Sequence, residues 1–181
     1  MSGYKNTFFS VLPLLLVALM VVAGFLWYTG RIALNFESLT TYANPMLGVS
    51  FRYPTAWQPD ARYGVIGNIA GRYEGNNGFF GVDAISANDN IDAVTENLAN
   101  HKLKPYGIHP QILTLTVGKQ EARVIIPSKD QTSVKKEVVL IVRYPKPVRI
   151  KSNSYNFFLV VGDPSHIKMF AETLSFNTNE I

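Results

Sequence analysis

Apolar residues gather at the start of the chain and then alternate with polar ones along the rest. Residues 6–30 contain no Asp, Glu, Lys, Arg or His, and most of them are apolar. A helix of about 20 apolar residues spans the roughly 30 Å hydrocarbon core of a bilayer. We therefore expect a short tail and a transmembrane signal anchor at residues 1–30, with residues 7–28 in the membrane.

A cleaved signal peptide is the competing interpretation of this run. Its apolar region usually has roughly 7–15 residues, which is shorter than the run seen here. Residues 21–23 form a weak cleavage site, but the apolar stretch up to Tyr28 would make a poor mature terminus. We favour the uncleaved anchor, and cleavage stays open.

The charges that flank the run give only a weak orientation. Lys5 precedes it, whereas Arg31 and Glu37 follow it, so the positive-inside rule slightly favours a cytoplasmic N-terminus. We expect a single-pass protein of the cell membrane, with residues 36–181 outside the cytoplasm. The predicted organisation is the anchor, a linker at residues 31–40 and one domain at residues 41–181.

Short apolar segments in this domain predict strands joined by tight turns. Alternation at residues 49–53 predicts a strand that ends at Pro54, and Trp57 is expected to plug one end of the core. Residues 69–73 and 79–85 predict one hairpin, and residues 111–117 and 120–126 predict another. Apolar runs without alternation at residues 138–142 and 157–161 are typical of strands buried on both faces.

Helical spacing occurs twice. Ile91, Val94, Leu98 and Leu103 predict a helix over residues 90–102, and Asp163-Pro164 is expected to begin a second helix. Residues 145–154 read as a basic loop. The predicted fold class is α+β, a mostly antiparallel sheet with helices on both faces.

Charge divides unevenly along the chain. Residues 1–100 contain 5 Lys/Arg and 7 Asp/Glu, a net charge of −2, while residues 101–181 contain 12 and 6, a net charge of +6. A basic half can mark an anionic partner, but we favour the simpler interpretation of a solvated face that keeps the protein soluble. An extracytoplasmic location argues against nucleic acid.

Residues 42–57 carry a recognisable pattern. They contain G-V-S-F-x-Y-P-x-x-W at residues 48–57, and the chain later reads T-L-S-F at residues 173–176. Both segments resemble the PsbP-like domain family. The resemblance implies an antiparallel sheet sandwiched by helices, in proteins that act by binding other proteins rather than by catalysis. No residues here match the metal or chloride sites of the photosynthetic members.

A second pair of segments, residues 105–112 and 122–131, resembles uncharacterised membrane-attached proteins of spore-forming, Gram-positive bacteria. This resemblance implies no activity.

Residues that could carry catalysis are few. The chain has no Cys, and its histidines His101, His109 and His166 show no metal-binding spacing. We expect His101 at a helix end, His109 in a turn and His166 exposed. No G-x-S-x-G elbow is present, and Ser128-Lys129-Asp130 reads as a polar loop.

The acidic residues do not form a convincing site either. Their nearest cluster is Asp83, Asp89, Asp92 and Glu96, of which the last two are expected on the solvated face of a helix. The six glycines of residues 64–81 do not form a phosphate-binding loop. We therefore predict no catalytic residues, no cofactor and no metal.

The basic residues form the best candidate surface. The whole set is Lys135, Lys136, Arg143, Lys146, Arg149 and Lys151. Within it, the predicted binding residues are Arg143, Lys146, Arg149 and Lys151, with Tyr144 and Tyr155 available for stacking. A solvated loop without a binding role is the competing interpretation, which we favour slightly.

These observations favour one function and leave two others open. The leading hypothesis is a membrane-anchored extracytoplasmic accessory domain without catalytic activity, which contacts another envelope protein. The alternatives are an envelope hydrolase with a dispersed site, which clustering of His109 with a carboxylate would support, and a module that binds anionic lipid or wall polymer.

Overall fold

The computed structural model of the chain describes residues 37–87, 90–131 and 136–177. The predicted anchor lies outside these residues. Within the described part, no helix has the length and apolar character needed to cross a membrane.

The main element is a seven-stranded sheet in which every pairing is antiparallel. Its strands, in spatial order, are β3 (Gln58–Pro59), β6 (Arg72–Gly75), β7 (Gly78–Ile85), β11 (Asn153–Gly162), β10 (Val138–Ile150), β9 (Gln120–Ile126) and β8 (Gln111–Val117). The two continuous apolar runs lie in β10 and β11, near the middle of the sheet, where both faces are covered. Their burial confirms what the absence of alternation predicts.

A smaller sheet packs on one face of the first. It consists of β1 (Leu39–Asn44), β2 (Val49–Pro54) and β12 (Ser175–Phe176), again antiparallel. β1 begins two residues before the predicted start of the domain. A third pair, β4 (Val65–Ile66) with β5 (Ile69–Ala70), follows the 3₁₀ turn η1 (Ala61–Tyr63).

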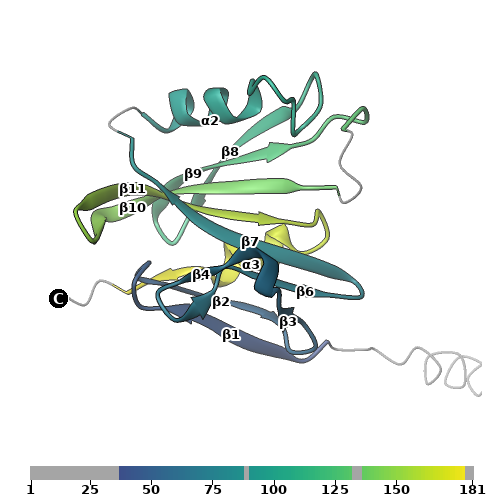
Figure 1. Cartoon of the computed structure of the whole chain (residues 1–181). Helices are drawn as coiled ribbons and strands as arrows, with labels where there is room; N and C mark the ends of the chain where they lie inside the picture. The colour runs from purple at the N-terminus through teal and green to yellow at the C-terminus, as the bar shows by residue number, and fades with distance from the viewer. Residues whose placement is uncertain (1–36, 88–89, 132–135, 178–181) are drawn as a thin grey trace, which may run out of the picture. The chain divides into compact units, whose positions relative to one another are not determined.

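The two helices lie on opposite faces of the seven-stranded sheet (Figure 1). α2 (Ile91–Ala99) begins after the cap Asn90 and packs Ile91 and Val94 on the face that carries Val139 and Ile141. α3 (Ile167–Thr173) and the smaller sheet cover the other face. The described residues therefore form mostly antiparallel sheets with two helices, as predicted for the class.

An aromatic core joins these layers. Phe80 of the large sheet packs against Phe51 of β2 and Phe170 of α3, with ring centroids 4.9 Å and 5.6 Å away. Trp57 is 2% exposed at one end of this cluster, which confirms its predicted role as a plug. Edge-to-face contacts of this kind stabilise a core beyond the area that they bury.

Three sequence expectations differ from the structure. α2 ends at Ala99, and Leu103, expected on its apolar stripe, is 81% exposed. α3 begins at Ile167, after a turn over residues 163–166, rather than at Pro164. Residues 145–154 are not a loop, because β10 continues to Ile150 and β11 begins at Asn153.

Candidate functional site

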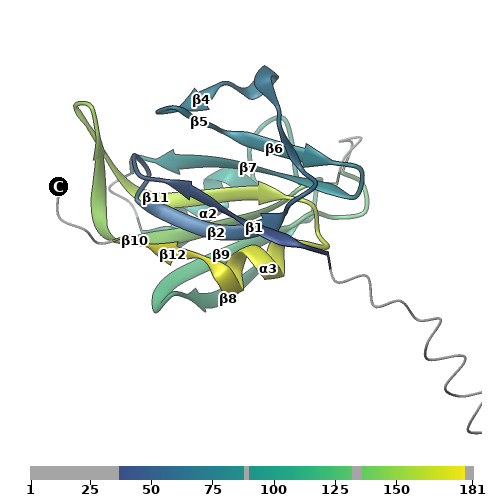
Figure 2. The same cartoon turned by 90° about the horizontal axis from the view of Figure 1, so that it is seen from below.

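The residues that join β10 to β11 form a two-stranded arm. β10 pairs with β9 only over Val139 to Val142, and β11 pairs with β7 only from Phe157 onward. Among the described residues, 144–156 therefore have no strand partner outside this hairpin. We call residues 144–156 the basic arm. It lies at the left margin of the described chain in Figure 1 and in Figure 2.

Charge on the basic arm is of one sign. Lys146, Arg149 and Lys151 are exposed, and the sequence has no acidic residue between Pro145 and Gly162. Val148 and Ile150 are half-buried against the core. Because side chains alternate along a strand, Arg149 points to the opposite face from these two residues. The arm thus has an apolar inner face and a cationic outer face.

Arg143, the fourth predicted binding residue, does not join this surface. Its side chain is half-buried, with Nε 3.5 Å from Oε2 of Glu121 and the guanidinium 4.9 Å from the centroid of the Phe157 ring. A register shift separates Arg143 from Val148. The structure therefore divides the predicted set into three arm residues and one residue of an internal network.

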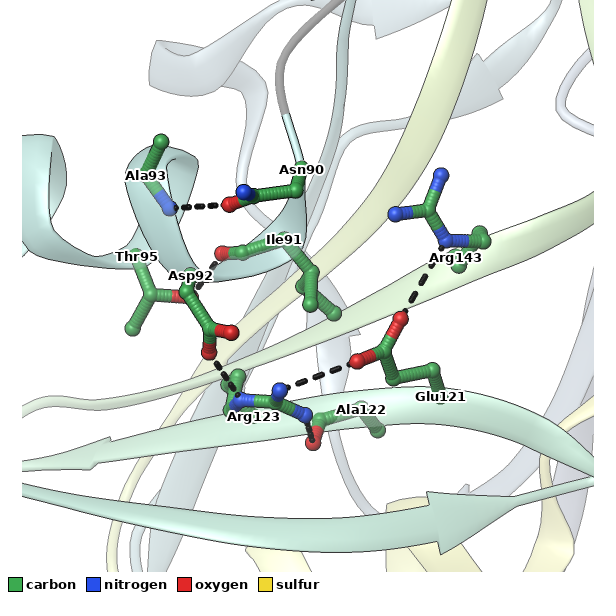
Figure 3. A network of polar contacts seen from close by, with 9 residues as sticks. All are labelled: Asn90, Ile91, Asp92, Ala93, Thr95, Glu121, Ala122, Arg123 and Arg143. Carbon is green, nitrogen blue, oxygen red and sulfur yellow. Dashed lines mark hydrogen bonds and ion pairs between the residues drawn. The ribbon is translucent and has the colours of Figure 1, made fainter.

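That network links β9 to the first turn of α2 (Figure 3). Arg123 is buried and donates from Nε to Oδ1 of Asp92 at 2.7 Å and from an Nη atom to Oε1 of Glu121 at 2.9 Å. Its other Nη atom donates to the carbonyl of Ala122. Asp92 is exposed, as expected, with 61% of its side chain accessible, and the hydrogen bond from Arg123 adds a contact with the sheet that the sequence pattern did not predict.

Two other residues of the basic and aromatic set, Lys136 and Tyr144, make contacts within the fold. Lys136 is exposed and donates to the carbonyl of Gln131 at 2.9 Å, while Lys135 lies outside the described residues. Tyr144 is buried, and its ring packs 5.4 Å from that of Phe176. Burial raises the pKa of the Tyr144 hydroxyl. The expectation that Tyr144 is available for stacking on a ligand is therefore wrong.

His166 was expected to be exposed, but the structure buries most of its side chain. Its Nδ1 lies 2.8 Å from Oδ1 of Asp163, and its ring packs edge-on against Trp57 with centroids 4.9 Å apart. The side chain is 13% exposed. Asp163 also accepts from the backbone N–H of Phe79, which ties the start of α3 to β7. This arrangement is a packed junction between elements.

His109 lies close to Ser128 and Asp130. The backbone N–H of His109 donates to Oγ of Ser128 at 3.2 Å, and that hydroxyl donates to the Asp130 carboxylate. This hydrogen bond lowers the pKa of Asp130. In a nucleophilic triad the imidazole stands between the hydroxyl and the carboxylate, which is not the arrangement of these contacts. The group instead joins the loops before β8 and after β9.

The other expected carboxylate positions show no metal-binding arrangement. Asp83 accepts from the backbone N–H of Ala84, Asp89 lies outside the described residues, and His101 accepts from the backbone N–H of Leu103. Across residues 37–87, 90–131 and 136–177, no three His, Asp or Glu side chains are grouped as metal ligands would be.

The chain was also compared with known proteins. No protein-family model and no curated protein matches it. Among solved structures, it is similar to the solution structure of cyanobacterial PsbP (CyanoP) from Synechocystis sp. PCC 6803. The two are 9% identical, the match covers 80% of this chain and 95% of that chain, and the TM-score is 0.45. A likeness at this level does not establish a shared family or a shared function.

Proposed function

We propose that the chain is a membrane-anchored, extracytoplasmic binding domain without catalytic activity, and that it contacts another envelope protein through the basic arm. The observation that carries this proposal is the arm itself, a hairpin that exposes Lys146, Arg149 and Lys151 within a segment whose charges are all positive. The apolar run at residues 7–28 supports the membrane location.

The form of the arm favours recognition by side chains. Pro145 and Pro147 have no N–H to offer, so this part of β10 is a poor template for an added strand. The packing of Val148 and Ile150 on the core holds the backbone that carries the outer cations. A backbone that is ordered in advance costs less entropy on binding. An acidic surface on a protein partner fits this arrangement.

The same cations make anionic lipid or wall polymer the second candidate. A cation near an anionic membrane surface contributes about 1 kcal/mol, and this contribution falls with added salt. Contact with an acidic protein surface also weakens with salt, but it joins the chain to one protein in a fixed ratio. The identity and stoichiometry of the crosslinked product therefore distinguish the two partners.

The test is crosslinking in native membranes with the full-length tagged chain, followed by purification in high salt. We expect one stoichiometric protein partner, which is lost when Lys146, Arg149 and Lys151 are all replaced by Gln. The matched control replaces Lys102, Lys104 and Lys129, three exposed lysines outside the arm, and should retain the partner. Salt-sensitive retention of lipid or polymer alone would favour the second candidate. Equal capture by both triple variants would exclude the arm as the contact surface.

A further inference from the structure

β8 is an edge strand without the usual protection against pairing. It is the last strand in the order of the seven-stranded sheet, next to β9 only. Ile112 and Leu113 are 41% and 49% exposed, and residues 111–117 contain no charge and no proline. Natural edge strands are commonly blocked by lysine, proline or a bulge, because free backbone groups otherwise recruit another strand.

The turn after β8 determines which backbone groups face outward. Gly118 and Lys119 have φ of 54° and 68°, the two positive values of a type I′ turn. In such a hairpin the flanking pair, Val117 and Gln120, exchanges hydrogen bonds, and hydrogen-bonded pairs alternate from there. Leu115 and Leu113 therefore bond to β9. Ile112, Thr114 and Thr116 direct their N–H and C=O groups to the open edge.

An apolar groove accompanies this edge. Leu113, Leu115 and Val117 form one wall, Ile167 and Ala171 of α3 form the other, and the cavity between them is about 550 Å³. The groove lies on the face of the sheet that the core residues Val124 and Val138 occupy. An incoming strand on β8 would extend the leucine wall.

We propose that a second copy of this chain pairs with β8 in antiparallel fashion, about a two-fold axis at Thr114. The residues on either side of Thr114 match under this symmetry, because Leu113 then faces Leu115 of the partner subunit on the groove side. Ile112 faces Thr116 of the partner subunit, and about six backbone hydrogen bonds form, two for each hydrogen-bonded pair. An isologous contact of this kind closes on itself.

Sequence symmetry and charge are the reasons for choosing a second copy as the occupant. With Leu113 and Leu115 on either side of Thr114, an antiparallel self-pair places leucine opposite leucine at both groove-side positions next to the axis. Because β8 carries no charge, two copies of a chain with net charge +4 bring no like charges together across the axis. The inference does not depend on the basic arm.

The first test uses a single thiol in the full-length chain in detergent micelles. The native sequence has no Cys, so Thr114→Cys supplies one reactive site, as does the control Gln58→Cys on β3 at the opposite edge of the sheet. A short bis-maleimide should give a crosslinked dimer with Thr114→Cys and little with Gln58→Cys. Equal yields from both variants would overturn the proposal, as would a product with a different protein in native membranes.

The second test changes the outward backbone group. Thr114→Pro removes the outward N–H but no bond to β9, whereas the control Thr114→Val keeps that N–H. We expect the dimer dissociation constant, measured by sedimentation, to rise about ten-fold or more for Thr114→Pro alone. Equal dissociation constants in folded samples of the two variants would overturn the proposal. The triple replacement in the basic arm should leave the dimer unchanged, so the two proposals fail separately.

Discussion

The Nε atom of Arg123 lies 2.7 Å from Oδ1 of Asp92, so that a buried cation of β9 holds the first turn of α2. Asp92 serves two partners at once, because a carboxylate near a helix N-terminus also stabilises the helix dipole. Glu121 accepts a second hydrogen bond from Arg123 at 2.9 Å, and its other oxygen lies 3.5 Å from Nε of Arg143, so two carboxylates meet two guanidinium groups. The helix is therefore attached by a directed polar contact in addition to its apolar face.

Loss of this contact should weaken the domain. We expect Asp92→Ala to lower the free energy of unfolding by about 1–2 kcal/mol, because Arg123 is buried and keeps only part of its partners. Urea denaturation measures the change. Glu96→Ala, one turn further along α2, is the control and should change the free energy by less than about 0.5 kcal/mol. Equal losses in the two variants would mean that the Arg123 contact contributes nothing specific.

Gly78 should tolerate no side chain. A Cβ at this position would lie 2.7 Å from Cζ2 of Trp57 and 2.9 Å from Nδ1 of His166, and closer still to the Asp163 carboxylate. We expect Gly78→Ala to lower the free energy of unfolding by about 2–4 kcal/mol through overpacking. Gly81→Ala on the same strand has its nearest contact at 3.7 Å and should cost under about 1 kcal/mol. Thermal denaturation of both variants measures the difference, and similar melting temperatures would contradict this account.

Local patterns predicted the elements that depend on neighbouring residues. The apolar runs of β10 and β11 and the hairpin of β8 and β9 follow from short-range rules. β1 was missed because its sequence, Leu-Thr-Thr-Tyr-Ala-Asn, buries only Tyr42 and Asn44 and therefore shows no clear alternation. The basic loop expected at residues 145–154 is instead mostly strand, because proline is tolerated where the β9 side of β10 has no strand to pair with.

Contacts between distant residues limited the prediction of the site. Arg143 and Lys146 are close in sequence, but only the fold reveals that Glu121 of another strand holds Arg143. The spacing of Asp163 and His166 was visible in the sequence. Their contact with Trp57 and with the turn at Gly78 depends on long-range packing that no local pattern contains.

Tyr106 should make the free energy of unfolding depend on pH in the alkaline range. Burial, and secondarily the Glu137 carboxylate, raises the pKa of the Tyr106 hydroxyl to about 12, against about 10 in an unfolded chain. Between these values the unfolded chain releases the proton while the folded chain keeps it. The free energy of unfolding therefore falls as pH rises from about 10 to about 12, by on the order of 2 kcal/mol for this residue.

Tyr106→Phe isolates this contribution. The variant should lose less stability than the native chain between about pH 9 and about pH 11.5, because Phe releases no proton. Tyr63→Phe is the control, since Tyr63 is 57% exposed, and it should follow the native chain. Urea denaturation at the two pH values measures both. An unchanged pH dependence in Tyr106→Phe would show that this hydroxyl is not the group that titrates.

Replacing Lys119 with glycine should stabilise the folded protein. Lys119 has the positive φ that the second position of a type I′ turn requires. This conformation costs a residue with a Cβ about 1 kcal/mol, whereas glycine adopts it without that cost. We expect Lys119→Gly to raise the free energy of unfolding by about 0.5–1 kcal/mol. Lys119→Ala removes the same charge but keeps a Cβ, so it should bring no such gain. Because self-association through β8 would make stability depend on concentration, both variants are compared by urea denaturation at several equal protein concentrations. A gain that is the same for Gly and Ala would assign the effect to the lost charge and not to the turn.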